Sequence, residues 1–324
     1  MTGTRVVTFG ESLLRLTPPG FERFLQTPHF NAVFGGAEAN VAVALSSFGM
    51  DAAYVTVLPE NNPIADAAIA ELRRFGVDTS HIVRGTGRLG TYYLELGANH
   101  RAGRAVYDRE HSAMALAKPG DIAWEKVFEG AAWFHITGIT PAISASAADL
   151  TLEAMRAAGQ RGLTISFDLN YRQNLWKWGK TAGEVMGSMM KHADILIGNE
   201  EHLRLVLGLS DPVVNNALTR YSHLKAVAVS LRGSSWSACL NDREQLLTSR
   251  SYDVAHSVDR IGAGDAFAAG LIYGWMNLPN RRDALEFAAA ACCLKHSIPG
   301  DYCRATAEEV RSLLSDPSPG RIHR

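Results

Sequence analysis

The sequence lacks any hydrophobic run long enough to cross a membrane. Its longest apolar stretches fall well short of the roughly 20 residues that a spanning helix needs. The N-terminus also has no long apolar segment of the kind found in secretory signals. We therefore expect a cytoplasmic protein with no membrane partner.

An excess of charge of one sign is also missing. The 324 residues carry a formal net charge of −1, and 20% of them are charged. Without a basic surplus, we expect no nucleic-acid partner. Apolar residues make up 47% of the chain, which is ordinary for a globular protein and argues against disorder.

Cysteines and common nucleotide-binding motifs are scarce. The four cysteines have no metal-ligand spacing, which fits a reduced compartment: Cys239, Cys292, Cys293 and Cys303. There is no Walker A sequence and no protein-kinase motif set. No G-x-G-x-x-G follows the first predicted strand, which disfavours a Rossmann dehydrogenase.

What the sequence does contain is a regular alternation of apolar and amphipathic segments. The segments that favour strands are 5–10, 52–58, 133–137, 163–169, 194–199 and 225–231. The segments that favour helices are 37–48, 64–75, 144–159, 181–191, 200–207, 265–277, 281–296 and 306–314. Strands that are apolar throughout and alternate with helices predict a parallel sheet covered on both faces. We expect one α/β domain over 1–324, built as a three-layer α/β/α sandwich.

Residues 90–108 depart from this pattern, because two runs of β-forming residues flank a polar turn. Such an arrangement predicts a hairpin. We expect 88–110 to join 11–34 in a small β-sheet that forms a lid beside the main sheet. An uncovered sheet face needs burial, so we expect a homodimer through the lid.

The strongest chemical motif is Asp-Arg-Ile-Gly-Ala-Gly-Asp-Ala-Phe-Ala-Ala-Gly at 259–270. Glycine allows close backbone approach, and the first amides of a helix attract anions. We predict that Gly262, Ala263 and Gly264 form an anion hole for phosphate. Asp265 at its mouth is the predicted general base, which accepts a hydroxyl proton during phosphoryl transfer. The alternative is a tight turn whose aspartate only caps the helix.

This motif resembles the second motif of the ribokinase-like (PfkB-type) carbohydrate kinases. The run Phe-Gly-Gly-Ala-Glu-Ala-Asn-Val-Ala at 34–42 resembles the N-terminal motif of the same family. The resemblance covers nearly the whole chain and implies a ribokinase-like fold and an ATP-dependent sugar kinase that uses Mg²⁺. It also implies that Gly35, Gly36 and Asn40 lie against the sugar.

Within the family the sequence is most similar to the 2-keto-3-deoxygluconate kinases. The similarity is carried by 35–40, 89–95, 106–110, 137–142 and 168–178. It implies substrate contacts from four side chains: Tyr92, Tyr107, Arg109 and Arg172. The implied reaction converts 2-keto-3-deoxygluconate to 2-keto-3-deoxy-6-phosphogluconate at the terminal hydroxyl.

A pair of arginines suits a sugar acid, because a planar guanidinium grips a carboxylate in a bidentate way. A neutral sugar needs no such arginine. Alternatively, Arg109 is an exposed strand residue, and Arg172 is a surface charge or a ligand of the ATP phosphates. A fructokinase, a ketodeoxygalactonate kinase and a non-catalytic sugar-binding regulator remain open as functions.

The nucleotide is expected at the carboxyl end of the strand 194–199, where open α/β sheets bind ligands. The resemblance implies nucleotide contacts from a set of residues on this side: Asn199, Ser230, Arg232, Gly233, Gly262 and Gly264. Relatives have Asn-x-x-Glu here, linked through water to Mg²⁺. This chain has His202 at the fourth position, so Glu200 or Glu201 would have to support the metal, and Glu200 is our candidate.

A monovalent-cation site is the last expectation from the resemblance. Asp259 and the loop 297–301 could form the site seen in relatives, which suggests K⁺ as a further cofactor.

Overall fold

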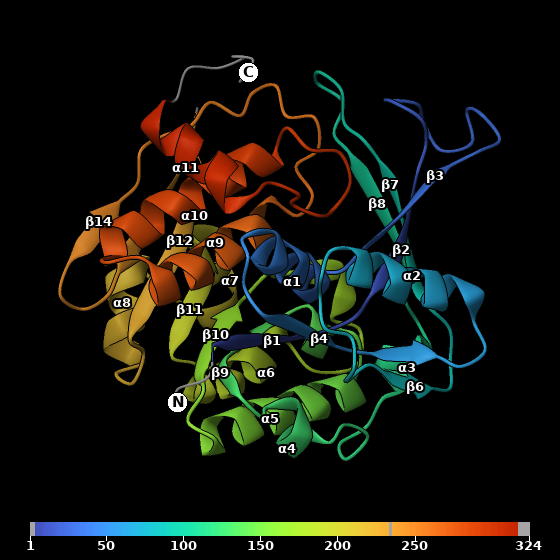
Figure 1. The fold of residues 1–324 in the computed structure, drawn as a ribbon, viewed down its shortest axis with the longest axis horizontal. Helices are drawn as coiled ribbons and strands as arrows, with labels where there is room; N and C mark the ends of the chain where they lie inside the picture. The colour runs from blue at the N-terminus through green and yellow to red at the C-terminus, as the bar shows by residue number, and fades with distance from the viewer. Residues whose placement is uncertain (1–3, 233–234, 317–324) are drawn as a thin grey trace.

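The computed structural model describes residues 4–232 and 235–316 (Figure 1). Its main element is an eight-stranded sheet in which the pairs from β12 to β4 are parallel and β13 and β14 form an antiparallel edge. In spatial order the strands are β14 (Leu246–Thr248), β13 (Trp236–Asn241), β12 (Ala226–Arg232), β11 (Ile195–Asn199), β10 (Thr164–Asp168), β9 (Ala131–Thr137), β1 (Arg5–Phe9) and β4 (Ala52–Val55).

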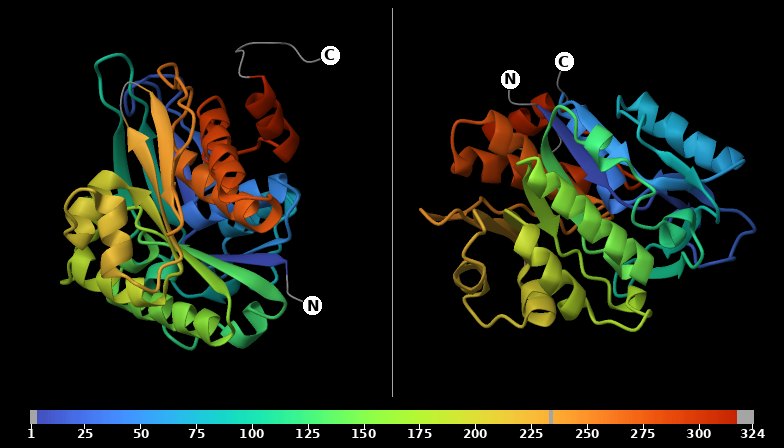
Figure 2. Two further views of the ribbon diagram at one scale, coloured as in Figure 1. Left: turned by 90° about the vertical axis from the view of Figure 1, so that its left-hand side faces the viewer. Right: turned by 90° about the horizontal axis from the view of Figure 1, so that it is seen from below.

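Side chains on both faces of this sheet are buried in helical layers. In β11, Leu196 packs into one apolar cluster, whereas Ile195 and Ile197 pack into the other, because neighbouring strand residues point to opposite faces. One layer contains α3 (Ala113–Leu116), α4 (Trp124–Val127), α5 (Ala145–Gln160), α6 (Ala182–Met189), α7 (Glu200–Leu207) and α8 (Val213–Arg220). The other contains α1 (Ala37–Ser47), α9 (Ala263–Asn277), α10 (Arg281–Lys295) and α11 (Ala307–Ser315). Figure 2 shows the sheet between the two layers, so the predicted three-layer sandwich is confirmed.

The single strand predicted at 52–58 is wrong. The chain leaves the main sheet after β4, and β5 (Val57–Pro59) pairs instead with β6 (Val83–Gly85) in a separate two-stranded sheet. The helix α2 (Pro63–Arg74) packs on β5 through Ala65 and Ile69. The mainly apolar run 52–58 therefore contributes strands to two sheets.

The predicted small sheet is present and contains residues from both expected segments. Its order is β3-β2-β7-β8, with β2 (Leu13–Thr17), β3 (Asn31–Gly35), β7 (Gly90–Glu95) and β8 (Arg104–Asp108). The pair β7–β8 is the predicted hairpin. In Figure 1 this sheet projects from the body at the upper right. Leu13, Tyr92 and Leu94 on it form an apolar cluster against Ile261, which lies one residue before the predicted anion hole.

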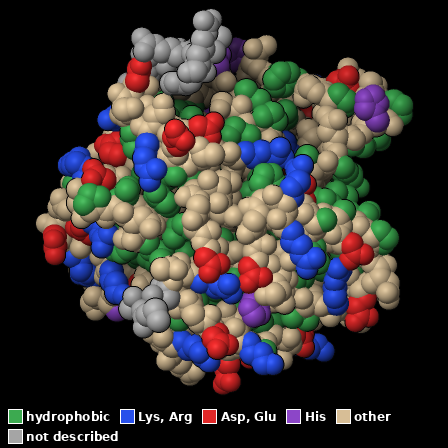
Figure 3. Space-filling view, in the orientation of Figure 1, with side chains coloured by type: hydrophobic (Ala, Val, Ile, Leu, Met, Phe, Trp, Pro, Cys, Tyr) green, Lys and Arg blue, Asp and Glu red, His purple; other side chains and the backbone are tan. Residues whose placement is uncertain are grey.

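The face of the molecule shown in Figure 3 carries charges of both signs. In Figure 3, Lys and Arg side chains are mixed with Asp and Glu over the face shown. Among the described residues, no helix combines the length and apolar character that a membrane span requires.

Candidate active site

Polar residues gather where neighbouring strands of the main sheet end. Thr137, Asp168 and Asn199 are the last residues of β9, β10 and β11, and Glu11 follows β1 by two positions. Since parallel strands end at one edge, these side chains belong to the edge where such sheets bind ligands. Only Asn199 was predicted as a site residue. A polar residue at or just after the end of an apolar strand was the signal for the other three.

Asp265 lies in the first turn of α9, three residues after Gly262. Its side chain is largely buried, with 7% of its surface exposed. Its Oδ2 accepts a hydrogen bond of 2.6 Å from Asn40 Nδ2, although the two residues are 225 positions apart. The structure thus brings the predicted base and the predicted sugar-binding asparagine into direct contact.

The surroundings of Asp265 bring the pKa of its carboxyl group close to neutrality. Burial raises the pKa of Asp265 to about 7, while the Asn40 hydrogen bond opposes the rise; the charge of Asp168 raises the pKa further and that of Arg172 lowers it. Burial also raises the pKa of Asp168 to about 6. A carboxylate with a pKa near neutrality is suited to general base catalysis at physiological pH.

The two glycines at the start of α9 differ in the space around them. Gly262 has a φ of 83°, and a Cβ there would lie 2.0 Å from the carbonyl oxygen of Asp301, so only glycine fits. Gly264 is exposed, and a Cβ there would meet no atom within 4 Å. The first helical bond runs from Ala266 N–H to Gly262 O, which leaves the Gly264 and Asp265 amides without partners inside the helix.

The glycine pair Gly35-Gly36 is required by its protein neighbours. A Cβ on Gly35 would lie 2.0 Å from Asp301 Oδ2, and one on Gly36 would lie 2.2 Å from the Glu11 carbonyl oxygen. Gly36 also has a φ of 139°. These contacts account for both glycines through packing, and their role in sugar binding stays a prediction.

Several buried polar atoms around Gly36 have no hydrogen-bond partner among the described residues. They include Glu11 Oε1, Ser12 Oγ and Asn40 Oδ1. Glu11 and Ser12 place backbone atoms against the position of a Gly36 Cβ, and Asn40 N–H donates to the Gly36 carbonyl. Buried polar atoms are rarely left unpaired in folded proteins. A ligand rich in hydroxyl groups would supply the missing partners.

Arg109 is buried, so the alternative that it is an exposed strand arginine is wrong. Its Nε and Nη2 both lie 2.6 Å from Glu11 Oε2, and the two side chains are 6% and 2% exposed. Tyr107 is half-buried, and its ring lies 5.9 Å from the Arg109 guanidinium and 6.1 Å from the Tyr92 ring. Tyr92 O–H donates to Asp301 Oδ2 at 2.7 Å. These three predicted residues lie together, and two of them already have strong polar partners.

Arg172 is exposed and lies close enough to lower the pKa of both Asp168 and Asp265. Its Nη1 donates to the Tyr171 carbonyl at 3.1 Å. It forms no ion pair with a carboxylate of the described residues. Of the two predicted arginines, Arg172 is therefore the one available to an incoming anion.

Three of the predicted nucleotide residues, Asn199, Ser230 and Arg232, belong to β11 and β12, whereas Gly262 and Gly264 lie at the start of α9. Asn199 is directly opposite Ser230 in the parallel register. Asn199 Oδ1 accepts from His202 N–H at 2.8 Å and so caps α7. Arg232 ends β12, but its side chain and Gly233 lie outside the described residues.

The structure gives limited support for a protein-bound metal. Across 4–232 and 235–316, no group of three or more His, Cys, Asp or Glu side chains could hold a metal ion. The Glu200 carboxylate is 41% exposed and lies 3.8 Å from Arg204. Mg²⁺ in proteins often keeps several waters and is held mainly by nucleotide phosphates. The support of the metal by Glu200 through water stays a prediction.

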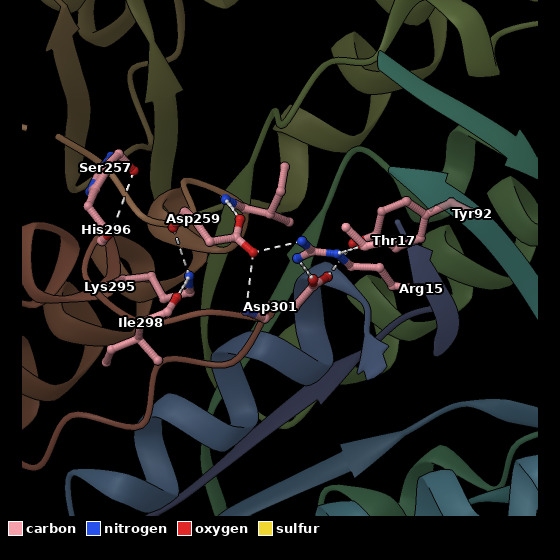
Figure 4. A network of polar contacts seen from close by, with 11 residues as sticks. Arg15, Thr17, Tyr92, Ser257, Asp259, Lys295, His296, Ile298 and Asp301 are labelled. Carbon is pink, nitrogen blue, oxygen red and sulfur yellow. Dashed lines mark hydrogen bonds and ion pairs between the residues drawn. The ribbon is translucent and has the colours of Figure 1, made fainter. Parts of the chain in front are cut away.

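Sequence reasoning missed Arg15, which links the small sheet to the turn before α9. Arg15 Nη2 lies 2.7 Å from Asp259 Oδ2, and its Nη1 lies 2.8 Å from Asp301 Oδ1 (Figure 4). Arg15 and Asp301 are 286 positions apart, so no local pattern joins them.

Comparison with known proteins agrees with this geometry. The model of the pfkB family of carbohydrate kinases matches residues 4–302. The chain is 33% identical over 311 residues to a 2-dehydro-3-deoxygalactonokinase of Haloferax volcanii, covering 95% of this chain and 96% of the relative. It is 28% identical to a 2-dehydro-3-deoxygluconokinase of Bacillus subtilis, covering 95% of each.

A solved structure extends the similarity to the fold. The 2-dehydro-3-deoxygluconokinase of Thermotoga maritima superposes with a TM-score of 0.92 at 44% identity, over 97% of this chain and 98% of that one. The ribokinase-like fold expected from the sequence is confirmed. The chain belongs to the pfkB family of carbohydrate kinases and is an ATP-dependent sugar kinase.

Proposed function

We propose that this kinase phosphorylates the terminal hydroxyl of a sugar acid, 2-keto-3-deoxygluconate, and forms 2-keto-3-deoxy-6-phosphogluconate. The observation that carries the proposal is the position of the Asp265 carboxylate. It lies in the first turn of α9, next to the exposed Gly264, and a hydrogen bond from Asn40 holds it there. A proton acceptor and free helix amides then stand side by side. Phosphoryl transfer to an alcohol needs both.

In the proposed reaction the sugar binds between the small sheet and the edge of the main sheet. Its terminal hydroxyl oxygen attacks the γ-phosphorus of ATP in line, and the bond to the β-phosphate oxygen breaks to release ADP. Asp265 takes the hydroxyl proton. The amides of Gly264 and Asp265 face the charge that develops on the phosphoryl oxygens. The Ala263 amide, also expected in the anion hole, already donates to the Arg260 carbonyl at 3.3 Å. Mg²⁺ bound to the nucleotide supplies further charge neutralisation.

Two observations support an acidic substrate. Arg172 is exposed near Asp168 and Asp265, where its guanidinium is available to a carboxylate or a phosphate. The relatives from Haloferax volcanii and Bacillus subtilis carry the names of kinases for two sugar acids. The galactonate epimer is the nearest alternative substrate. Fructose is the second, because a rice relative that is 31% identical is named fructokinase.

The substrate proposal is tested by ADP release across a panel of 2-keto-3-deoxygluconate, its galactonate epimer, fructose and ribose. A hydrogen bond to a charged group contributes about 1.5–3 kcal/mol, so we expect kcat/KM for the sugar acids to exceed that for the neutral sugars by about 10- to 100-fold. Equal values for fructose would contradict the proposal. A protein that binds these sugars without releasing ADP would be the non-catalytic regulator.

The proposed phosphate site is tested by a pair of glycine variants. Gly264→Ala places a methyl group in open space at the start of a helix, so the melting temperature should not fall. Because the Cβ bonds of a helix tilt toward its N-terminus, the same methyl group should crowd the space in front of the free amides, and kcat/KM for ATP should fall by at least about tenfold. Full activity of this variant would contradict the phosphate site.

Gly262→Ala is the matched control for stability. It forces a side chain into a left-handed conformation that costs roughly 1–2 kcal/mol, and into contact with the Asp301 carbonyl. It should therefore lower the melting temperature, unlike Gly264→Ala. The comparison separates an effect on folding from an effect on ATP.

The small sheet also supports the expected homodimer. Large apolar side chains are exposed on its segments: Phe21, Leu25 and Val106. Burial of such residues against a second copy would remove apolar surface from water. A monomeric mass in light scattering at assay concentration would contradict dimerisation.

A further inference from the structure

Lys295, the last residue of α10, is completely buried. Its ammonium nitrogen donates to the backbone carbonyl of Asp259 at 3.1 Å and to that of Ile298 at 2.9 Å (Figure 4). Proteins that bind K⁺ surround the ion with backbone carbonyl oxygens in a similar way. The ammonium group therefore contacts Asp259 and the loop 297–301. These are the two segments that were expected to form a monovalent-cation site.

Charge balance argues against an additional cation at this place. The carboxylates of Asp259 and Asp301 are both 3% exposed, and both are bound by Arg15. Together with Lys295 the cluster contains two positive and two negative groups, all of them buried. A bound K⁺ would add an unpaired charge in a buried environment, which is costly.

The cluster is in direct contact with the turn that precedes α9. Asp259 Oδ1 accepts from Ile261 N–H at 3.0 Å, and Asp259 Oδ2 accepts from Gly300 N–H at 3.1 Å. A Cβ on Gly262 would lie 3.3 Å from Lys295 Cε. The position of the ammonium group therefore sets where the backbone of 259–262 lies relative to the loop 298–301.

We propose that the ammonium group of Lys295 takes the place of a bound monovalent cation. It holds the Asp259 and Ile298 carbonyls and so positions the phosphate-binding turn without K⁺. Lys295 is a positioning residue, because it touches neither sugar nor nucleotide in the proposed reaction. The kinetic part of this inference rests on the proposed function. The effect on the fold does not.

The kinetic test replaces Lys295 by alanine and by methionine, and measures kcat/KM for ATP in tetramethylammonium, sodium, potassium and ammonium chloride at equal ionic strength. The wild type should vary by less than about twofold among the four salts, since its cation is covalently attached. Lys295→Ala should lose about 10- to 100-fold in tetramethylammonium, because the two carbonyls lose their donor. Potassium or ammonium ions should restore at least about tenfold of that loss by entering the space left by the side chain.

Lys295→Met is the matched control, because its side chain fills most of the same space without charge. It should lose activity as Lys295→Ala does and should not recover in potassium or ammonium. Activation of the wild type by K⁺ over tetramethylammonium, or full activity of Lys295→Ala without a small cation, would overturn the proposal. So would an equal response of both variants to K⁺.

A measurement without substrates keeps the test independent of the proposed reaction. K⁺ should raise the melting temperature of Lys295→Ala relative to tetramethylammonium, because an ion that binds only the native state stabilises it. The melting temperatures of the wild type and Lys295→Met should not depend on which of the two cations is present. Equal shifts in all three proteins would mean that no site was created. Failure of the sugar assignment would leave these shifts unchanged.

Discussion

Replacing Asp265 with asparagine should lower kcat by about 10²–10⁴ and change KM little, because the variant loses the proton acceptor but keeps the shape. The asparagine carbonyl can still accept the hydrogen bond that Asn40 donates in the wild type. Steady-state kinetics with the sugar acid and ATP measure the effect. Asp149→Asn, the same chemical change at an exposed position of α5, is the control and should leave kcat unchanged. Near-normal turnover of Asp265→Asn would contradict its assignment as the base.

The same residue predicts a pH dependence. Because burial raises the pKa of Asp265 to about 7, kcat/KM of the wild type should rise with pH and level off above about 7, where the carboxylate is ionised.

The stability of the wild-type protein should instead decrease with pH through the contribution of Asp265. The folded state holds this proton more tightly than the unfolded state, whose pKa is near 3.8, so the contribution of Asp265 to stability falls as pH rises from about 4 to about 7. Asp265→Asn removes that fall, so its melting temperature should gain on the wild type across this range.

The position of Asp265 was predictable because local physical chemistry specifies it. Two glycines flanking an alanine before an apolar helix indicate a tight turn and a start with free amides. The alternation of buried strands and helices likewise indicated a parallel sheet with two covered faces. Each pattern is read from residues that are close together in the chain, so no knowledge of distant partners was needed.

Features that depend on distant partners were not predictable. Arg15 lies in a strand of the small sheet, and nothing near it in the sequence indicates that Asp259 and Asp301 will surround its guanidinium. The pairing of Arg109 with Glu11, 98 positions away, is of the same kind. The short helix α8, with its adjacent Asn215 and Asn216, was also missed, because a weak local pattern is stabilised here by burial of Val213 and Leu218 in the core.

The buried Arg109–Glu11 pair determines how a role of Arg109 in binding the substrate carboxylate can be tested. If Arg109 grips the substrate carboxylate, Arg109→Ala should raise KM for the sugar acid by about 10²–10³ and KM for ATP by less than about threefold. However, the variant also leaves Glu11 buried without its cation, which by itself costs about 3–5 kcal/mol. The sugar acid KM alone cannot distinguish a lost ligand from a disturbed small sheet.

Glu11→Gln separates the two roles, because it removes the competing carboxylate and keeps the guanidinium. The decisive quantity is kcat/KM for the sugar acid divided by kcat/KM for fructose. A disturbed small sheet lowers both values, so its effect cancels in this ratio. A carboxylate-binding Arg109 predicts that this ratio collapses toward unity in Arg109→Ala and is kept or increased in Glu11→Gln, whose guanidinium has one anionic partner fewer. If the ratio instead falls by the same factor in both variants, Arg109 acts through Glu11 to hold the small sheet in place. The exposed Arg172 would then be the remaining arginine for the substrate carboxylate, and Arg172→Ala would have to lower the ratio on its own.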